Sequence, residues 1–478
     1  MRPLSWVRRP ALTATTASLA ALLLAGGATA QSMQDIPGMA PMATAQPKSA
    51  PPPPPAQTPA PATTSDMGGM DMGRMDMGGM DMGAKDSPGG MTMMNGQLGG
   101  YATMRDASGT SWQPDSTPMD GWMWRSGGWT GMTHGYVDFV YDQQNGPRGA
   151  VKDFSESMLM VMAQHGLGPG DLTLRTMLSL DPAMGADGYP LLLQTGETAN
   201  GVTPLIDRQH PHNLFMELAV VYSQPLIAGT SGFVYVGYPG EPALGPVTFM
   251  HRFSGMDDPA APITHHWLDS THITYGVVTT GLIWNQWKIE GSVFNGREPD
   301  QYRWGFDPLQ LNSYSGRLSY NPTPNWALQV SYGDLHSPEQ LTPDVNQERV
   351  TASATYNHPL AGGNWQTTLA WGRDHDEPGN ILDGVLLESA VNLGRHTLFG
   401  RVETVEKDDL FETPSPFAGR TFHVSEASLG YVYDIPLAAH LALGLGIQGT
   451  VNLVPAPIQP VYGVDPTGYM PFVRLKIR

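Results

Sequence analysis

Methionine recurs at a fixed spacing in the stretch DMGGMDMGRMDMGGMDMG, residues 66–83. The repeat alternates M-x-x-M with M-x-M and carries an Asp at every fifth position. Thioether sulfur is a soft, neutral ligand that favours Cu(I) and coordinates without first losing a proton. The sequence therefore predicts a tract that binds copper or silver ions, with a linker of functionless methionines as the alternative. The expected ligands are Met67, Met70, Met72, Met75, Met77, Met80 and Met82.

Histidine supplies a second set of candidate ligands. All 14 His lie at or after residue 134, and six of them fall within residues 210–272. They lie in or beside the two longest connections between expected strands, 182–211 and 239–270, and binding groups are often found in such loops. If these strands form a β-barrel, as argued below, imidazole nitrogens there could receive a transition-metal ion inside the lumen of the barrel or at its mouth. The candidates are His210, His212, His251, His265, His266 and His272.

Two other interpretations of these loops remain open. The histidines could pack the loops and bond to carboxylates, with Arg208, Arg252 and Asp257 as structural ion-pair partners. A hydrolase would need a nucleophile beside a base, and Ser270 lies near His272 in sequence. The chain contains no G-x-S-x-G elbow and no Gly-rich phosphate loop, so we do not expect an enzyme.

Composition limits the compartment and the partners. The chain has no Cys, which suits an exported protein that avoids thiols in an oxidising environment. A net charge of −18 argues against a nucleic-acid partner, because binding a phosphate backbone needs a basic face. The expected partners are outer-membrane lipid and, for the copper hypothesis, periplasmic copper proteins; the oligomeric state stays open.

Four segments are expected along the chain. Residues 1–30 read as a signal peptide, with basic residues, an apolar stretch and an Ala-Thr-Ala cleavage site. Residues 31–99 are Pro- and Met-rich, and we expect them to be disordered because they lack the apolar residues that order a chain. Residues 100–132 are rich in Trp and could form a plug or an interfacial anchor. Residues 133–478 alternate in short segments divided by turn residues.

Alternation of apolar and polar residues predicts an all-β fold in this last part. In 326–333 and again in 364–373, large apolar residues share one face, with aromatics about 20 Å apart at its ends. Short and long connections also alternate, as in outer-membrane barrels. We predict an antiparallel transmembrane β-barrel of about 16 strands, within a range of roughly 12 to 18. Met160 and Met162 are expected on its apolar outer surface.

The chain resembles known proteins at two levels. A signal peptide, a Met-rich acidic tract and a barrel together are similar to copper-resistance outer-membrane proteins of the PcoB/CopB type. Separately, much of 105–310 resembles a group of bacterial exported β-barrel proteins with no assigned activity. The stretches that carry this second resemblance are SGTSWQPDSTPM (108–119), LRTMLSLDPAMGADGYPLLLQTGET (174–198), LIDRQHPHNLFMELA (205–219), THHWLDSTHITYG (264–276) and GREPDQYRW (296–304).

These observations predict a protein of the Gram-negative outer membrane with its N-terminal tract in the periplasm. We expect copper or silver binding that contributes to metal tolerance or transport, with a copper ion as the implied ligand. The first alternative is a porin-like channel for another small solute, in which the Met tract is a passive tether. The second is an outer-membrane hydrolase.

Overall fold

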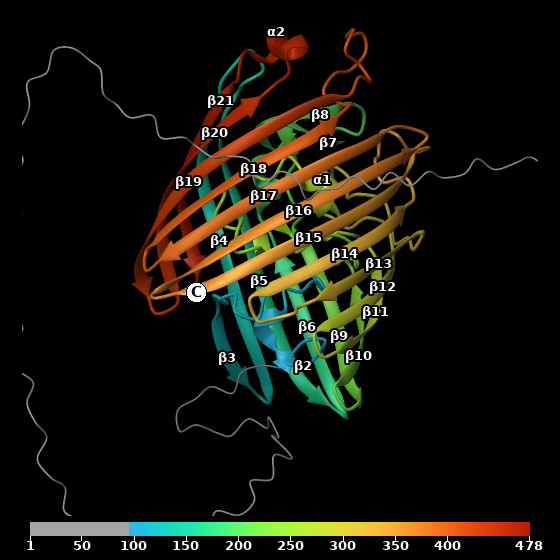
Figure 1. Ribbon diagram of the computed structural model, residues 1–478, viewed down its shortest axis with the longest axis vertical. Coiled ribbons are helices and arrows are strands. Elements are labelled where there is room, and N and C mark those ends of the chain that lie inside the picture. Colours follow the sequence, from blue (N-terminus) through green and yellow to red (C-terminus); the bar gives the residue numbers. More distant parts are fainter. Residues whose placement is uncertain (1–94) are drawn as a thin grey trace, which may run out of the picture. The chain divides into compact units, whose positions relative to one another are not determined.

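The computed structural model describes residues 95–478, so the expected signal peptide and the seven tract methionines lie outside the described residues. Sixteen antiparallel strands close into a barrel (Figure 1). Strand β21 completes the ring by pairing with β4, and β6 pairs with β9. The wall strands are β4 (Trp129–Gln144), β5 (Val151–Leu167), β6 (Gly170–Leu178), β9 (Phe215–Ile227), β10 (Thr230–Gly237), β11 (Val277–Trp284), β12 (Trp287–Phe294), β13 (Ser313–Tyr320), β14 (Trp326–Leu335), β15 (Asn346–Leu360), β16 (Gly363–Glu377), β17 (Ile381–Leu393), β18 (His396–Lys407), β19 (Phe422–Ala438), β20 (Leu441–Leu453) and β21 (Thr467–Ile477).

The other elements lie outside the sixteen-strand ring. No helix among residues 95–478 is long and apolar enough to span a membrane. These other elements are β1 (Asn95–Gly96), β2 (Gly99–Ala102), η1 (Thr103–Arg105), β3 (Trp122–Ser126), η2 (Asp181–Met184), β7 (Tyr189–Thr198), β8 (Pro204–Gln209), η3 (Phe249–His251), α1 (His265–Leu268), η4 (Ser270–His272), η5 (Ala456–Ile458) and α2 (Gln459–Tyr462).

The outer face of the wall is apolar and the inner face is polar. On β16 Leu369 is 53% exposed, whereas its neighbour Thr368 is fully buried. Aromatic side chains such as Trp326 and Tyr332 lie exposed toward the two ends of the same strand face. An apolar outer band with aromatic rims around a closed barrel is the arrangement of outer-membrane barrels. The predicted fold class is therefore confirmed, and the barrel contacts lipid in the outer membrane.

The two ends of the barrel differ in their connections. Tight turns such as 285–286, 361–362 and 394–395 join strands at one end, and long loops join them at the other. Outer-membrane barrels have short turns on the periplasmic side and long loops outside. The tight-turn end is therefore the periplasmic end.

Two expectations about individual residues are wrong. The strand expected to begin at residue 271 begins at Val277, because residues 271–276 remain in a loop inside the barrel. Met160 and Met162 were expected on the outer surface, but both are buried and face the lumen, while Leu159, which directly precedes Met160, is exposed. Strand β5 thus places methionines on its inner face and other apolar residues on its lipid face.

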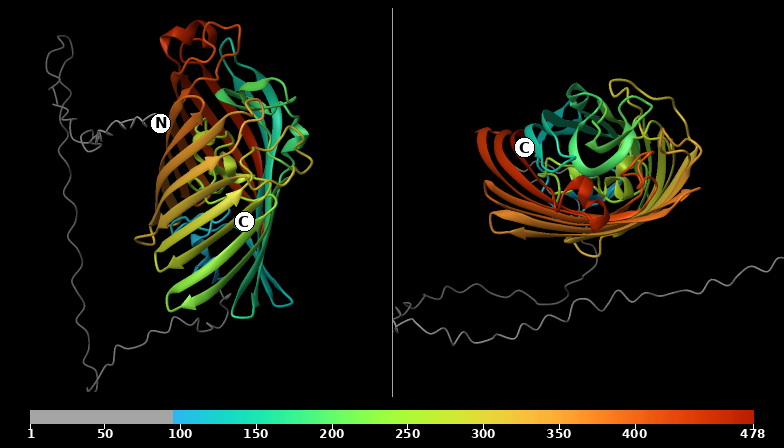
Figure 2. Two further views of the ribbon diagram at one scale, coloured as in Figure 1. Left: turned by 90° about the vertical axis from the view of Figure 1, so that its right-hand side faces the viewer. Right: turned by 90° about the horizontal axis from the view of Figure 1, so that it is seen from above.

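Residues 238–276, which we call the plug, fold back into the barrel between β10 and β11. Figure 2 shows this segment within the wall when the barrel is seen from above. The ends of the plug meet where Gly240 and Thr274 exchange backbone hydrogen bonds of 2.9 Å. Helix α1 packs against the wall because Gly372 leaves room for it: a Cβ at Gly372 would lie 2.1 Å from the Trp267 carbonyl oxygen.

Two tryptophans of the Trp-rich segment have different surroundings. Trp112 is buried inside the barrel, where Lys288 of the wall lies 4.9 Å from the centre of its ring. Trp122 of β3 is exposed and lies on a hairpin with β4 at the tight-turn end. One tryptophan therefore helps to fill the lumen, and another remains exposed; whether this segment is a plug or an interfacial anchor stays a prediction.

Buried ion pairs join the plug to the wall. Arg252 of the plug bonds to Glu388 of β17 and to Asp269, each at 2.7 Å. Arg474 of β21 bonds to Asp257 of the plug at 2.7 Å. Charges that are buried in this way must be paired, because an isolated buried charge costs several kcal/mol. These contacts fix the position of the plug within the lumen.

The Arg252 network gives a test of this anchoring. Replacing Arg252 with Leu removes the arginine that two buried carboxylates share, so we expect a loss of about 3–5 kcal/mol in the free energy of unfolding. The control is Arg373→Leu, which removes an exposed pair with Asp383 and should cost less than about 1 kcal/mol. Guanidinium unfolding in detergent, followed by tryptophan fluorescence, measures both. Equal losses would contradict the anchoring role.

Candidate metal centres

Five of the six predicted histidine ligands lie together inside the barrel. The ring centres of His210 and His266 are 6.1 Å apart, and those of His265 and His266 are 5.7 Å apart. His272 lies 5.2 Å from His265 and 5.3 Å from His212. The structure thus brings together residues from the loop after β8 and from the plug.

Three of these histidines are held by a bond at one ring nitrogen. Nδ1 of His265 bonds to the Asp269 carboxylate at 2.6 Å, and Nδ1 of His272 bonds to the Asp269 carbonyl at 2.9 Å. Nδ1 of His212 bonds to Asp181 at 2.8 Å. In the described part of the chain their Nε2 atoms have no hydrogen-bond partner, and metal-bound histidines are oriented in the same way.

An apolar side chain nevertheless packs against this trio. The ring of Phe249 lies 6.1 Å from that of His212 and 5.3 Å from that of His265. Among residues 95–478, two other clusters bring three ligand atoms within 4.8 Å of one another, and the trio is not one of them. The geometry of His212, His265 and His272 therefore fits a packed core better than a bound ion.

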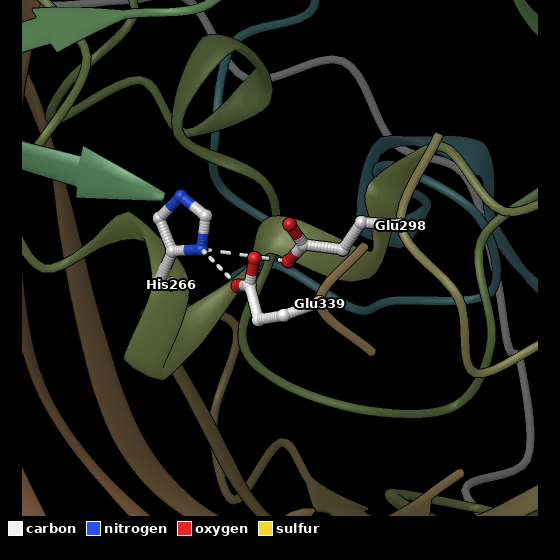
Figure 3. A group of neighbouring side chains, drawn as sticks. All are labelled: His266, Glu298 and Glu339. Atoms are coloured by element: carbon white, nitrogen blue, oxygen red, sulfur yellow. Dashed lines mark ion pairs between the residues drawn. The ribbon is translucent and has the colours of Figure 1, made fainter. Parts of the chain in front are cut away.

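His266 belongs to one of the two compact clusters. Its Nδ1 lies 3.4 Å from Glu298 and 3.9 Å from Glu339, which come from the loops after β12 and β14 (Figure 3). The other cluster, Glu348, His375 and Glu377, is more exposed and lies on β15 and β16 near the outer end. Imidazole and carboxylate ligands suit divalent cations better than Cu(I).

His251 lies apart from the other predicted ligands and contacts sulfur. Its Nε2 is 3.2 Å from the Sδ atom of Met177, and its ring centre is 5.9 Å from that of His134. His134, Met160 and Met177 are direct cross-strand partners on the inner faces of β4, β5 and β6. Two imidazoles and the Met177 thioether thus meet where the plug contacts the inner wall, and strand register places Met160 between His134 and Met177.

A cavity of about 80 Å³ borders this group. Its lining is rich in thioethers, because Met132 and Met162 pair across β4 and β5 and the plug adds two more. Burial lowers the pKa of His251 well below its usual range, and His134 and Arg175 act in the same direction. The imidazole is therefore neutral at neutral pH and free to coordinate. The methionines of the lining are Met119, Met132, Met160, Met162, Met250 and Met256.

The hydrogen bonds of Ser270 do not form a catalytic relay. Its hydroxyl accepts a bond of 3.0 Å from Arg349. His272 bonds to the backbone carbonyl of Asp269, while the Asp269 carboxylate bonds to Arg252 and His265. The alternative in which Arg252 and Asp257 are structural ion-pair partners is also supported, because both residues form ion pairs with the wall.

Sequence reasoning missed the partners that complete both groups. Glu298 and Glu339 are single acidic residues in separate loops, and nothing in their spacing marks them. His134, Met160 and Met177 could have been found, because Met158, Met160 and Met162 alternate with Leu159 and Val161. That pattern gives a strand two different apolar faces, and one of them must point inward.

Comparison of sequences finds no matching protein family and no matching curated protein. Similar solved structures include OmpF of Salmonella typhi in a complex with daunomycin, with a TM-score of 0.45 and 8% identity over 74% of this chain and 100% of that one. The anion-selective porin of Comamonas acidovorans has a TM-score of 0.44 and 11% identity over 73% and 100%. OprB of Pseudomonas putida has a TM-score of 0.44 and 9% identity over 73% of this chain and 94% of that one. These proteins share a barrel architecture with this chain, and at such scores and identities the likeness extends no further.

Proposed function

We propose that this outer-membrane barrel binds Cu(I) or Ag(I) and contributes to tolerance or transport of the metal. The observation that carries the proposal is the inner-wall group of His134, Met160, Met177 and His251. We call this group the soft site.

The chemistry of the soft site suits a monovalent soft ion. Thioether and neutral imidazole are ligands that favour Cu(I) and Ag(I) over hard cations. Since all four ligands are neutral, a bound ion would keep its single positive charge. Asp106 and Asp120 line the same cavity and can offset that charge. A divalent ion would leave more charge uncompensated in a buried place.

The position of the soft site agrees with delivery from the Met tract. Met132 and Met162 lie near the ends of β4 and β5 that face the tight turns, so the cavity is nearer the periplasmic end. Gln97, close to the start of the described chain, also lines it. Met82 precedes Gln97 by 15 residues, a separation that spans at most about 50 Å. An ion captured by the tract would thus remain tethered within reach of the cavity.

Silver binding tests both parts of this proposal. We expect wild-type protein in detergent to bind Ag(I) at the tract and at the soft site in isothermal titration. Replacing Met160 and Met177 together with Leu should abolish the soft-site event, because it removes both thioethers at similar volume. Changing the seven tract methionines to Ile should abolish the tract events alone.

The matched control is Met158→Leu, since Met158 lies on the same strand face but pairs with Tyr136 away from the group. It should bind Ag(I) as the wild type does. If the Met160/Met177 double variant also binds as the wild type does, the soft site is wrong.

The porin-like alternative is a channel for another small solute. The anchored plug within the lumen argues against a wide open pore. We therefore expect low potassium conductance for the wild type in planar bilayers, and higher conductance for Arg252→Leu because the plug loses one of its anchors to the wall. A high wild-type conductance that ignores both Arg252→Leu and deletion of residues 31–94 would favour the porin.

A further inference from the structure

We propose that His266, Glu298 and Glu339 form a second metal site, specific for a divalent transition ion such as Zn²⁺ and open to the outer end of the barrel. The proposal is independent of Cu(I) binding, because it uses different residues, different ligand atoms and the opposite end of the lumen. We call it the divalent site.

The three ligand atoms are already close to the positions that Zn²⁺ requires. Zinc binds His nitrogen and carboxylate oxygen at about 2.0–2.2 Å, so tetrahedral ligand atoms lie about 3.3–3.5 Å apart. Nδ1 of His266 lies 3.4 Å from Glu298 Oε1 and 3.9 Å from Glu339 Oε1 (Figure 3). All three ligand atoms lie within 4.8 Å of one another, so a movement of Glu339 toward the other two would complete the geometry. Glu339 can move, since its side chain is 35% exposed.

The position of the imidazole is fixed by close packing of the backbone. A Cβ at Gly196 would lie 2.4 Å from Cε1 of His266, so only glycine allows strand β7 to approach the ring this closely. Gly196 also has a φ of 108°, which other residues rarely adopt. The ring is thus held while its Nδ1 faces the two carboxylates.

Buried polar atoms at the site lack partners. Within residues 95–478, neither Glu298 Oε2 nor His266 Nε2 has a hydrogen bond, although both are buried. Buried carboxylate oxygens are almost always bonded, and an exception points to an absent ion or water. The unpartnered atoms are an observation independent of the ligand spacing, and they indicate that an ion or a water molecule belongs at the site.

The charges at the site favour a cation. Burial is the largest influence on Glu298 and acts to raise its pKa, but His266, Arg349 and His210 together lower it. Burial and the adjacent Glu298 carboxylate raise the pKa of Glu339, against the opposing effect of His266. Both carboxylates face the same imidazole nitrogen, and a divalent ion bound between the three groups would offset the charge of both carboxylates.

Two other acids near the site already have cationic partners. Glu197 pairs with Arg303 and Asp374 pairs with Arg349. In the described ion pairs, Glu298 and Glu339 share only His266 as a cationic partner. These two carboxylates therefore lack an arginine or lysine partner of their own among the described ion pairs.

A cavity gives the site access to ions. His266 and Glu339 line a cavity of about 580 Å³, together with residues of the outer loops. Its lining is strongly acidic, which raises the local concentration of cations. An ion at the site would have room for a water molecule as a fourth ligand, as in zinc sites that remain open. The other acidic residues of the lining are Glu197, Asp374, Asp376, Asp408, Asp409 and Glu412.

An ion here would join three segments that are far apart in sequence. His266 belongs to α1 of the plug, whereas Glu298 and Glu339 belong to two separate outer loops. Metal binding would therefore tie the plug to those loops and stabilise the native state by mass action. The unfolding midpoint should rise with Zn²⁺ concentration.

Zinc binding to the full chain tests the proposal. Titration of Zn²⁺ against a chromophoric chelator should give one tight site in the wild type and at least a tenfold weaker one in Glu298→Gln/Glu339→Gln. The single variant Glu339→Gln, at a partly exposed position, should fold normally and show an intermediate loss. Wild-type affinity in both variants would overturn the proposal.

Two controls separate this site from the others. Glu348→Gln/Glu377→Gln alters the exposed cluster on β15 and β16, so it should leave the tight zinc site unchanged; loss of the site in this variant would place the ion there instead. The Met160→Leu/Met177→Leu variant should also keep the tight zinc site. X-ray absorption at the zinc edge should show nitrogen and oxygen at about 2.0–2.2 Å, and a sulfur shell near 2.3 Å would contradict the assignment.

Discussion

Charges inside a protein must be paired, and this barrel satisfies that requirement with its own loops. The inner wall carries arginines, a lysine and carboxylates that are nearly or fully buried, such as Arg317, Lys288 and Glu388. Some of their partners lie on the wall and others on chain that has folded inward, as when Arg317 donates to the Gly245 carbonyl at 3.0 Å. The polar lumen and the inserted segments are therefore one structure. Removing either would leave the other with unpaired charge.

This pairing also decides which side chains remain free for chemistry. Asp269 bonds to Arg252 and to His265, so the anchor of the plug and the orientation of one histidine depend on a single carboxylate. A few groups that could bind an ion are not fully paired by this network. They are the thioethers beside His251 and the carboxylates beside His266, and they lie toward opposite ends of the lumen. A soft ion and a harder one would thus meet different surroundings in the same barrel.

The strands could be predicted from the sequence because their signal is local. A period of two along 326–333 or 364–373 reports the lipid face directly, and each turn residue marks an end. The positions of the plug residues could not be predicted in this way. Arg252 and Glu388 are 136 residues apart, and no periodicity connects them. The strand expected to begin at residue 271 was also placed too early. Residues 271–276 fold inside the barrel, and no local pattern in the sequence marks this. Met160 was misplaced because an apolar residue on an inner face breaks the usual rule for barrels.

The seam between the first and last wall strands carries a further consequence. Arg474 of β21 bonds to Asp138 of β4 across the seam at 2.6 Å and also to Asp257 of the plug. One guanidinium therefore serves both the closure of the ring and the contents of the lumen. If the ring closed around an empty interior, Asp257 would have no partner and Arg474 only half of its own. Closure of the ring and occupation of the lumen are therefore energetically coupled, because the same guanidinium stabilises both.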